Sequence, residues 1–141
     1  MNTKRTRYQT QWAAQFFAAA ELTRRGYLTS FTLGNAPVVD LLVVSPNDCH
    51  FRVDVKGLSS KNYWLVQERE SQTDLYYILV YLSPIPNPPN YYILRSDELM
   101  KTIGDAKSAT IAAGKKWVDW GSGISWGAAL QYHDRWDLLP S

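Results

Sequence analysis

The chain of 141 residues is poor in the side chains that build disulfides and zinc sites, with one cysteine, Cys49, and two histidines. A single cysteine excludes an internal disulfide, and this usage is typical of a reducing compartment. His50 and His133 lack the spacing to partner ligands that zinc sites and metalloprotease helices require. We therefore expect no zinc centre and no disulfide scaffold.

Long hydrophobic runs and a strong charge imbalance are also missing. The longest apolar run, LYYILVYL at 75–82, is far shorter than the roughly 20 residues that a membrane-spanning helix needs. The basic N-terminal residues lead into an amphipathic segment without the apolar core of a secretory signal. Fifteen Lys and Arg against 13 Asp and Glu leave a net charge of only +2, so a basic surface would have to be local. We expect a soluble, cytoplasmic protein.

The composition that remains is sufficient for a hydrophobic core, because 45% of the residues are hydrophobic and 13% are aromatic. No internal repeat or long linker divides the chain. We expect one domain over 1–141, with a core at about 7–100 and an extension at about 101–141. The extension contains four of the six tryptophans, which indicates a helical or loop-rich aromatic cover: Trp117, Trp120, Trp126 and Trp136.

The patterning predicts a helix first and then mainly strands. Alanine-rich residues 7–25 favour a helix ended by Gly26, with Trp12, Phe16, Phe17, Ala19 and Ala20 on the face toward the sheet. Strands are expected at 27–33, 38–45, 50–56, 63–66, 75–82 and 91–95, and a second helix is expected with Ser96 as its N-cap. The 38–45 strand is predicted to be buried on both faces. This order indicates an α/β domain with a mixed central sheet.

Three charged residues lie in the two apolar segments that the SPND turn at 45–48 joins. Asp40 interrupts an apolar run, whereas Asp54 and Lys56 alternate with Val53 and Val55 along the next strand. If these strands form a hairpin, the two carboxylates come to adjacent positions and repel each other. Mg²⁺ relieves such repulsion, since it binds one or two carboxylates together with water and substrate phosphate.

The ordered set AAAEL, APVVD and VDVKG resembles the PD-(D/E)XK nuclease superfamily, over about residues 10–82. The resemblance implies a restriction-endonuclease-like or Holliday junction resolvase-like fold and a metal-dependent endonuclease that hydrolyses phosphodiester bonds in double-stranded or branched DNA. It implies that Asp40, Asp54 and Glu21 hold Mg²⁺, for which Mn²⁺ substitutes, and that Lys56 positions or activates the attacking water. The second acid is Asp where Glu is commoner, and the proline stands three positions before Asp40.

Less specific interpretations stay open for each residue. Glu21 can pair with Arg24 or Arg25, and Asp54 and Lys56 can form a solvent-facing ladder with Arg52. Gln67 and the polar residues 59–61 follow the D-X-K strand, where they suit either a loop or a contact with substrate phosphate. Basic side chains that can line one edge near the site and contact a nucleic-acid backbone are Lys4, Arg5, Arg7, Arg24, Arg25, Arg52, Lys56 and Lys61.

The biological role is open between restriction or phage defence and DNA repair. A homodimer or a partner subunit would suit a small nuclease that acts on two strands. The alternative function is a catalytically inactive module that keeps the nuclease fold and binds nucleic acid or a protein partner.

Overall fold

The computed structural model describes residues 4–33, 39–118 and 121–141. It begins with helix α1 (Arg7–Arg24), close to the predicted range. Thr6 caps the helix through a reciprocal pair of hydrogen bonds with Gln9. The helix ends before Gly26, whose φ of 94° suits glycine better than residues with a side chain.

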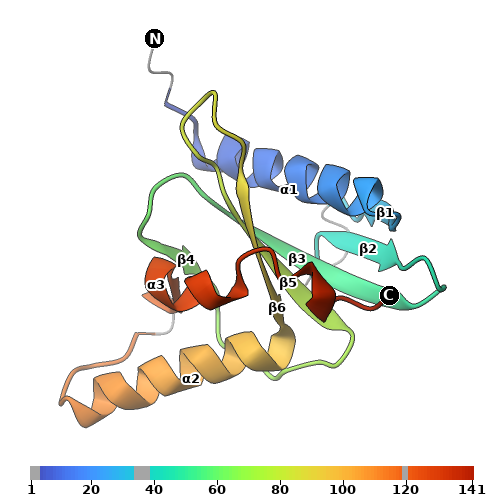
Figure 1. The fold of residues 1–141 in the computed structure, drawn as a ribbon. Coiled ribbons are helices and arrows are strands. Elements are labelled where there is room, and N and C mark those ends of the chain that lie inside the picture. The colour runs from blue at the N-terminus through green and yellow to red at the C-terminus, as the bar shows by residue number, and fades with distance from the viewer. Residues whose placement is uncertain (1–3, 34–38, 119–120) are drawn as a thin grey trace.

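A mixed sheet of five strands follows, in the spatial order β1-β2-β3-β5-β6 (Figure 1). Strands β3 and β5 are parallel, and the other neighbours are antiparallel. The connection from β3 to β5 contains the short strand β4 in place of the helix that most parallel crossovers include. The protein is therefore an α/β protein, and its sheet strands are β1 (Leu28–Phe31), β2 (Leu41–Val44), β3 (His50–Leu58), β5 (Leu75–Tyr81) and β6 (Asn90–Arg95).

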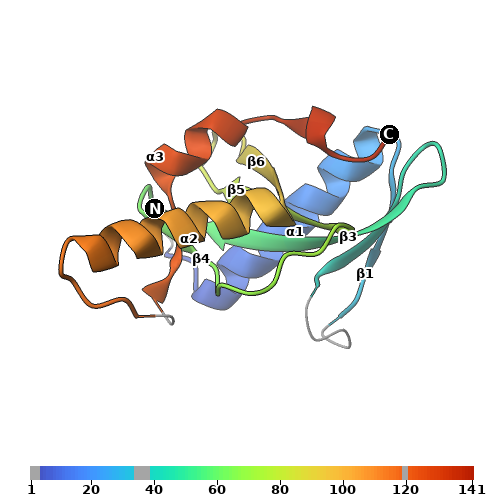
Figure 2. The same cartoon turned by 90° about the horizontal axis from the view of Figure 1, so that it is seen from below.

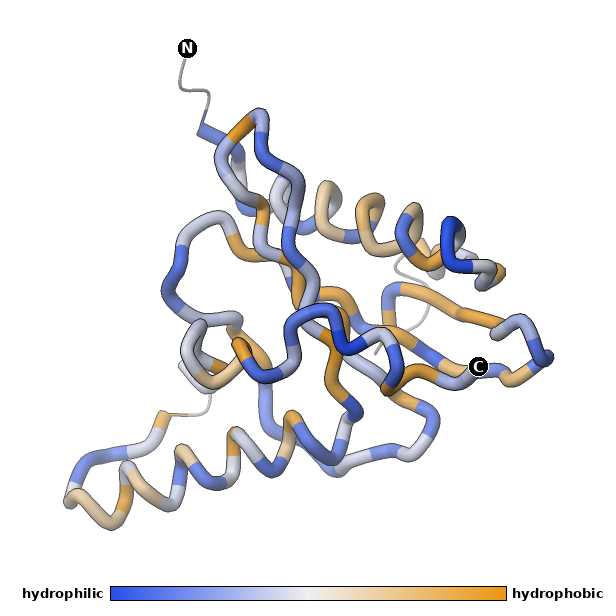
Figure 3. The backbone as a smooth tube through the Cα atoms, in the orientation of Figure 1, coloured by the Kyte–Doolittle hydropathy of each residue, from blue (hydrophilic) through white to orange (hydrophobic). Residues whose placement is uncertain are grey.

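Helices α1 and α2 (Ser96–Ala112) lie on opposite faces of this sheet, as Figure 2 shows from below. Hydrophilic and hydrophobic residues alternate along α2 (Figure 3), as expected for a helix with one face on the sheet. The chain then forms a second, two-stranded sheet and ends in short helices. These elements are β4 (Tyr63–Leu65), β7 (Gly123–Ser125), α3 (Trp126–Ala129) and 3₁₀ helices at Leu130–Tyr132 and Trp136–Leu138.

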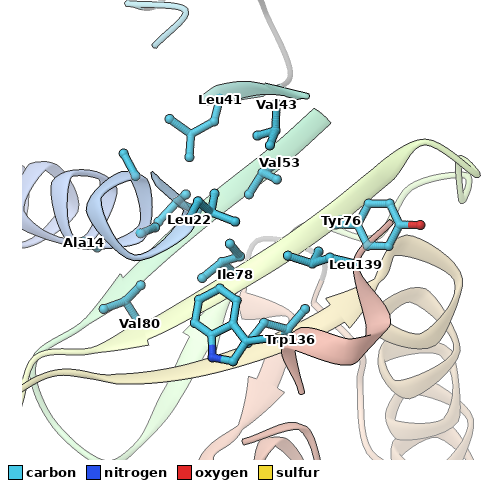
Figure 4. Packing of buried hydrophobic residues seen from close by; sticks show 14 of the residues in the cluster. Ala14, Leu22, Leu41, Val43, Val53, Tyr76, Ile78, Val80, Trp136 and Leu139 are labelled. Atoms are coloured by element: carbon cyan, nitrogen blue, oxygen red, sulfur yellow. The ribbon is translucent and has the colours of Figure 1, made fainter. Parts of the chain in front are cut away.

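The core under α1 is made by small helix residues rather than by the predicted aromatic ones. Ala14, Ala18, Ala19 and Leu22 are buried there, whereas Phe16 is 58% and Phe17 43% exposed. Figure 4 shows Ala14 and Leu22 packed over β-strand side chains, with Trp136 and Leu139 closing one side. The predicted face was wrong, except for Ala19 and the half-buried Trp12, because the helix approaches β3 too closely for large side chains.

The aromatic extension does cover the core, as predicted. Trp126 stacks on Trp64 with ring centroids 5.8 Å apart, and Trp136 is only 8% exposed. Arg25 lies over the Trp136 ring at 4.4 Å from its centroid, so the chain end is fastened to the C-terminal end of α1. Trp120 lies outside the described residues.

Two further predictions need correction. The strand predicted at 38–45 begins only at Leu41, and Leu42 is 50% exposed, so β2 has one buried face because none of the described helices covers its other side; residue 38 lies outside the described residues. The N-cap of α2 is Arg95, and Ser96 is the first helical residue. None of the described helices has the length and hydropathy required to traverse a lipid bilayer.

Candidate active site

The site forms where β2 and β3 stop pairing. Leu41 and Val53 are the last partners of the antiparallel ladder, beyond which the Asp40 backbone N–H still donates to the Val53 carbonyl at 3.1 Å. Beyond this point the Asp40 side chain replaces the β2 backbone as the hydrogen-bond partner of β3. Its Oδ2 accepts from the Val55 backbone N–H at 2.8 Å. Asp40 therefore caps the free part of β3, which fixes its carboxylate beside the D-X-K segment.

The alternation predicted for β3 is confirmed. Val53 and Val55 are fully buried in the core under α1, so Asp54 and Lys56 point to the other face of the sheet. The side chain of Asp54 is 12% exposed and that of Lys56 33%, and Lys56 Nζ lies 3.6 Å from Asp54 Oδ2. The hairpin thus brings Asp40, Asp54 and Lys56 together.

The protonation of Asp54 reflects this crowding. Burial raises its pKa to about 7, and Lys56 opposes the rise by favouring the charged form. The neighbouring Asp40 carboxyl raises the pKa further through a hydrogen bond, which two carboxyls form only when one of them carries a proton, and through charge repulsion. Near neutral pH Asp54 therefore changes between its neutral and its charged form.

Arg69 is a site residue that the sequence did not indicate. It lies in the loop after β4, with Nη2 3.8 Å from Asp54 Oδ2 and its guanidinium carbon 5.5 Å from the centre of the Tyr77 ring. Its Nε and Nη2 are buried without a hydrogen-bond partner among the described residues. Donors left over in this way can bind an anion that arrives at the site. Gln67, for which the sequence left open a contact with substrate phosphate, lies two residues before Arg69 and is exposed.

Gln11 of α1 also belongs to the site. Its side-chain amide donates to the Val55 carbonyl at 2.7 Å and accepts from the Gly57 N–H at 3.1 Å. Both groups lie on the edge of β3 that β2 has left, so Gln11 and Asp40 together satisfy this stretch of backbone. A Cβ on Gly57 would come within 2.9 Å of Ala14 Cβ, which shows how closely α1 approaches the strand.

The structure does not bring Glu21 to these acids. Glu21 forms ion pairs with Arg24 at 2.7 Å and Arg25 at 3.0 Å, and the hydrogen bond from Arg24 lowers its pKa. It lies ten residues after Gln11 along α1, about 15 Å along the helix axis. Asp54 points to the opposite face of the sheet. Glu21 is therefore a salt-bridged residue that lies away from the acid pair.

Other side chains considered from the sequence are engaged elsewhere. Arg52 lies on the same strand but forms an ion pair with Asp74 at 2.8 Å. His50 lies 3.3 Å from Asp48 at the surface, and His133 packs against the Tyr92 ring. A ladder of Arg52, Asp54 and Lys56 in solvent does not form, because Asp54 is buried.

The donor set near Asp54 is small. In the part of the chain that the structure describes, no three His, Cys, Asp or Glu side chains gather as they would around a metal ion. The two carboxylates still suit Mg²⁺, which completes its octahedron with water and substrate phosphate. The raised pKa of Asp54 comes mainly from burial, with a smaller part from the neighbouring Asp40, and a divalent cation would favour the charged form of this acid.

A pocket of about 470 Å³ is lined by Arg5, by the start of α1 and by several residues between Lys56 and Leu65, Lys56 among them. Lys56 Nζ also lies 3.6 Å from Asp54 Oδ2, so this lysine connects the pocket with the acid pair. No family model, curated protein or solved structure matches the chain in comparison searches.

Proposed function

We propose that the protein is a metal-dependent endonuclease with a restriction-endonuclease-like fold that hydrolyses phosphodiester bonds in DNA. One observation carries the proposal, namely the convergence of Asp40, Asp54 and Lys56 where β2 leaves β3. A buried acid, Asp54, beside a second acid and a lysine is costly for stability, which is typical of a functional site rather than a structural one. The order of α1 followed by an antiparallel β1-β2-β3 sheet and a parallel β5 is compatible with this fold.

Asp40 and Asp54 would hold Mg²⁺ or Mn²⁺, which polarises the scissile phosphate and lowers the pKa of a water molecule. Asp40 is oriented for this by the hydrogen bond from the Val55 N–H. Gln11 holds the same backbone from the other side, so the two acids are attached to a fixed segment. Glu21 is left out of this ligand set.

The cations stabilise negative charge. Lys56 Nζ has three donors and, among the described residues, one acid in ion-pair distance, which leaves donors for a phosphate oxygen or for the attacking water. Arg69 offers a buried Nε and Nη2 without hydrogen-bond partners among the described residues, and these groups suit the charge that develops on the phosphate in the transition state. Both side chains point to the face that Asp54 occupies.

The test is a cleavage assay on linear, plasmid and branched DNA, with EDTA, Mg²⁺ or Mn²⁺. Asp54→Ala and Lys56→Ala are expected to lose at least about 100-fold in rate while remaining folded. Lys101 and Asp105 provide a matched control, because they form an exposed acid–lysine pair on α2 at 3.0 Å. Cleavage by Lys56→Ala at the rate of Lys101→Ala would refute the proposed role.

A non-catalytic nucleic-acid-binding module is the second candidate, and Arg69 favours it. Two cations already lie within 3.8 Å of Asp54 Oδ2, so the charge of this acid can be balanced without a metal. Titration with Mn²⁺ followed by thermal unfolding separates the candidates. A nuclease gains stability with metal and loses that gain in Asp54→Asn, whereas a module of this kind shows no gain in either protein.

A further inference from the structure

The lining of the pocket beside Lys56 contains three basic side chains. Arg5 and Arg7, around the start of α1, line it together with Lys56 at the end of the D-X-K segment. None of the described residues that line it is acidic, and the first turn of α1 contains no acid. Three cations without a lining acid create a positive potential in a concave site, which attracts anions.

Arg5 supplies an independent sign that a ligand is needed. Its Nε is buried and has no hydrogen-bond partner among the described residues. A buried guanidinium nitrogen without a partner is costly, and such groups often mark the place of a bound ion. Phosphate oxygens match the planar, fork-shaped donors of arginine better than other common anions do, carboxylates apart.

The pocket lining also includes groups suited to a less polar part of a ligand. Tyr63 and Leu65 line it and are 44% and 49% exposed, although both are large and hydrophobic. Ser59, Ser60 and Asn62 also line it and offer hydrogen-bonding groups. A ligand with a phosphate, a polar sugar and an aromatic base fits this set of lining residues, because bases stack on tyrosine rings.

We propose that this pocket is a nucleotide subsite, which holds one phosphate and the adjoining sugar and base of a nucleic-acid strand. Arg5 and Arg7 bind the phosphate, and Tyr63 supports the base. Lys56 belongs both to the pocket and to the acid pair, so a strand can occupy both places at once, whereas a free nucleotide would fill only the pocket. The subsite rests on the proposed function for its role, since it would position the strand for cleavage.

Binding is measured without cleavage, in EDTA, from the fluorescence anisotropy of a labelled oligothymidine strand of about 15 nucleotides and of a duplex of equal length. For the one phosphate that the two arginines bind, the dependence of affinity on salt predicts that Arg5→Ala/Arg7→Ala weakens single-strand binding about fivefold at 0.1 M salt. The slope of log K against log salt should become smaller by about 0.7. Circular dichroism melting checks that the variant is folded.

Lys115→Ala/Lys116→Ala is the matched control, because it removes the same two charges at exposed positions after α2. This control is expected to bind within about threefold of the wild type, because its charges lie away from the pocket. If the two double variants lost affinity for the oligonucleotide equally, general charge attraction would explain the binding, and the subsite would be overturned. Tyr63→Ala should weaken binding several-fold while keeping the salt slope, because it removes stacking without removing charge.

Thymidine 5′-monophosphate serves as competitor and separates the two sources of a nucleotide phosphate. Weak competition supports a strand, and competition stronger than that of the oligonucleotide overturns it. Wild-type protein that binds neither nucleic acid nor the mononucleotide also overturns the subsite. If the protein binds the strand strongly through Arg5 and Arg7 but does not cleave DNA in Mg²⁺ or Mn²⁺, the subsite proposal stands and the proposed nuclease function is refuted.

Discussion

Replacing Asp54 by asparagine should stabilise the metal-free protein at alkaline pH. The pKa of Asp54 is raised from 3.8 to about 7, mainly by burial. The folded protein therefore favours the neutral acid, and its ionisation costs stability. An amide of the same shape keeps the neutral form at every pH, so Asp54→Asn removes this cost. The variant tests the electrostatics of the site independently of any cleavage.

The magnitude follows from the shift. About three pKa units at 1.36 kcal/mol each correspond to about 4 kcal/mol of unfolding free energy. Because the pKa is raised in the folded state, the contribution of the neutral acid is complete below pH 3.8 and is lost as the pH rises through about 7. The advantage of the asparagine variant should therefore be about 2 kcal/mol near pH 5 and about 4 kcal/mol near pH 8.

Urea unfolding in EDTA at these two pH values measures the difference. Asp105→Asn is the control, since Asp105 is an exposed partner of Lys101 and its loss should change stability by less than about 1 kcal/mol at both pH values. A destabilised Asp54→Asn variant, or a gain that does not grow with pH, would show that Asp54 is ionised and satisfied by Lys56 and Arg69. The acid pair would then need no metal cation.

Three other substitutions test the surroundings of the site. Gly57→Ala should destabilise the protein by about 1–3 kcal/mol in urea unfolding, because its Cβ would meet Ala14 Cβ and the Thr10 carbonyl at 2.9 Å; unchanged stability would mean that α1 can retreat from β3. Gln11→Ala should cost about 1–3 kcal/mol, since it leaves two backbone groups of β3 without partners, and a neutral result would show that water replaces the amide. Glu21→Gln should leave the cleavage rate unchanged and lower the unfolding free energy by less than about 1 kcal/mol. Cleavage that is tenfold slower would show that Glu21 does contribute to the metal site.

Much of the site was readable from local patterns. The two-residue period of β3 placed Asp54 and Lys56 on one face, and the turn residues after β2 predicted the hairpin that brings Asp40 beside them. Both patterns depend on neighbours in sequence, so tertiary packing did not alter them. The metal ligands themselves stay a prediction.

The missed features all depend on contacts between distant segments. Gln11 matters because α1 approaches Gly57 closely, and the same close approach buries alanines where phenylalanines were expected. Arg69 matters because its loop returns over Tyr77 to reach Asp54. The amphipathic pattern of α1 selects the largest apolar side chains, whereas the helix approaches the strand at Gly57 so closely that only the small Ala14 fits between them.

The separation of β2 from β3 links stability to the proposed chemistry. A longer ladder would satisfy the Val55 backbone with β2 and leave Asp40 without its place beside the D-X-K segment. Instead, the Asp40 carboxylate and the Gln11 amide replace the missing strand. Two side chains thus occupy the edge of β3 beside Asp54 in place of strand β2. A full ladder between β2 and β3 would bury fewer charges. An acid that serves as a strand cap is positioned before any ligand arrives, and such preorganisation is what a catalytic carboxylate requires.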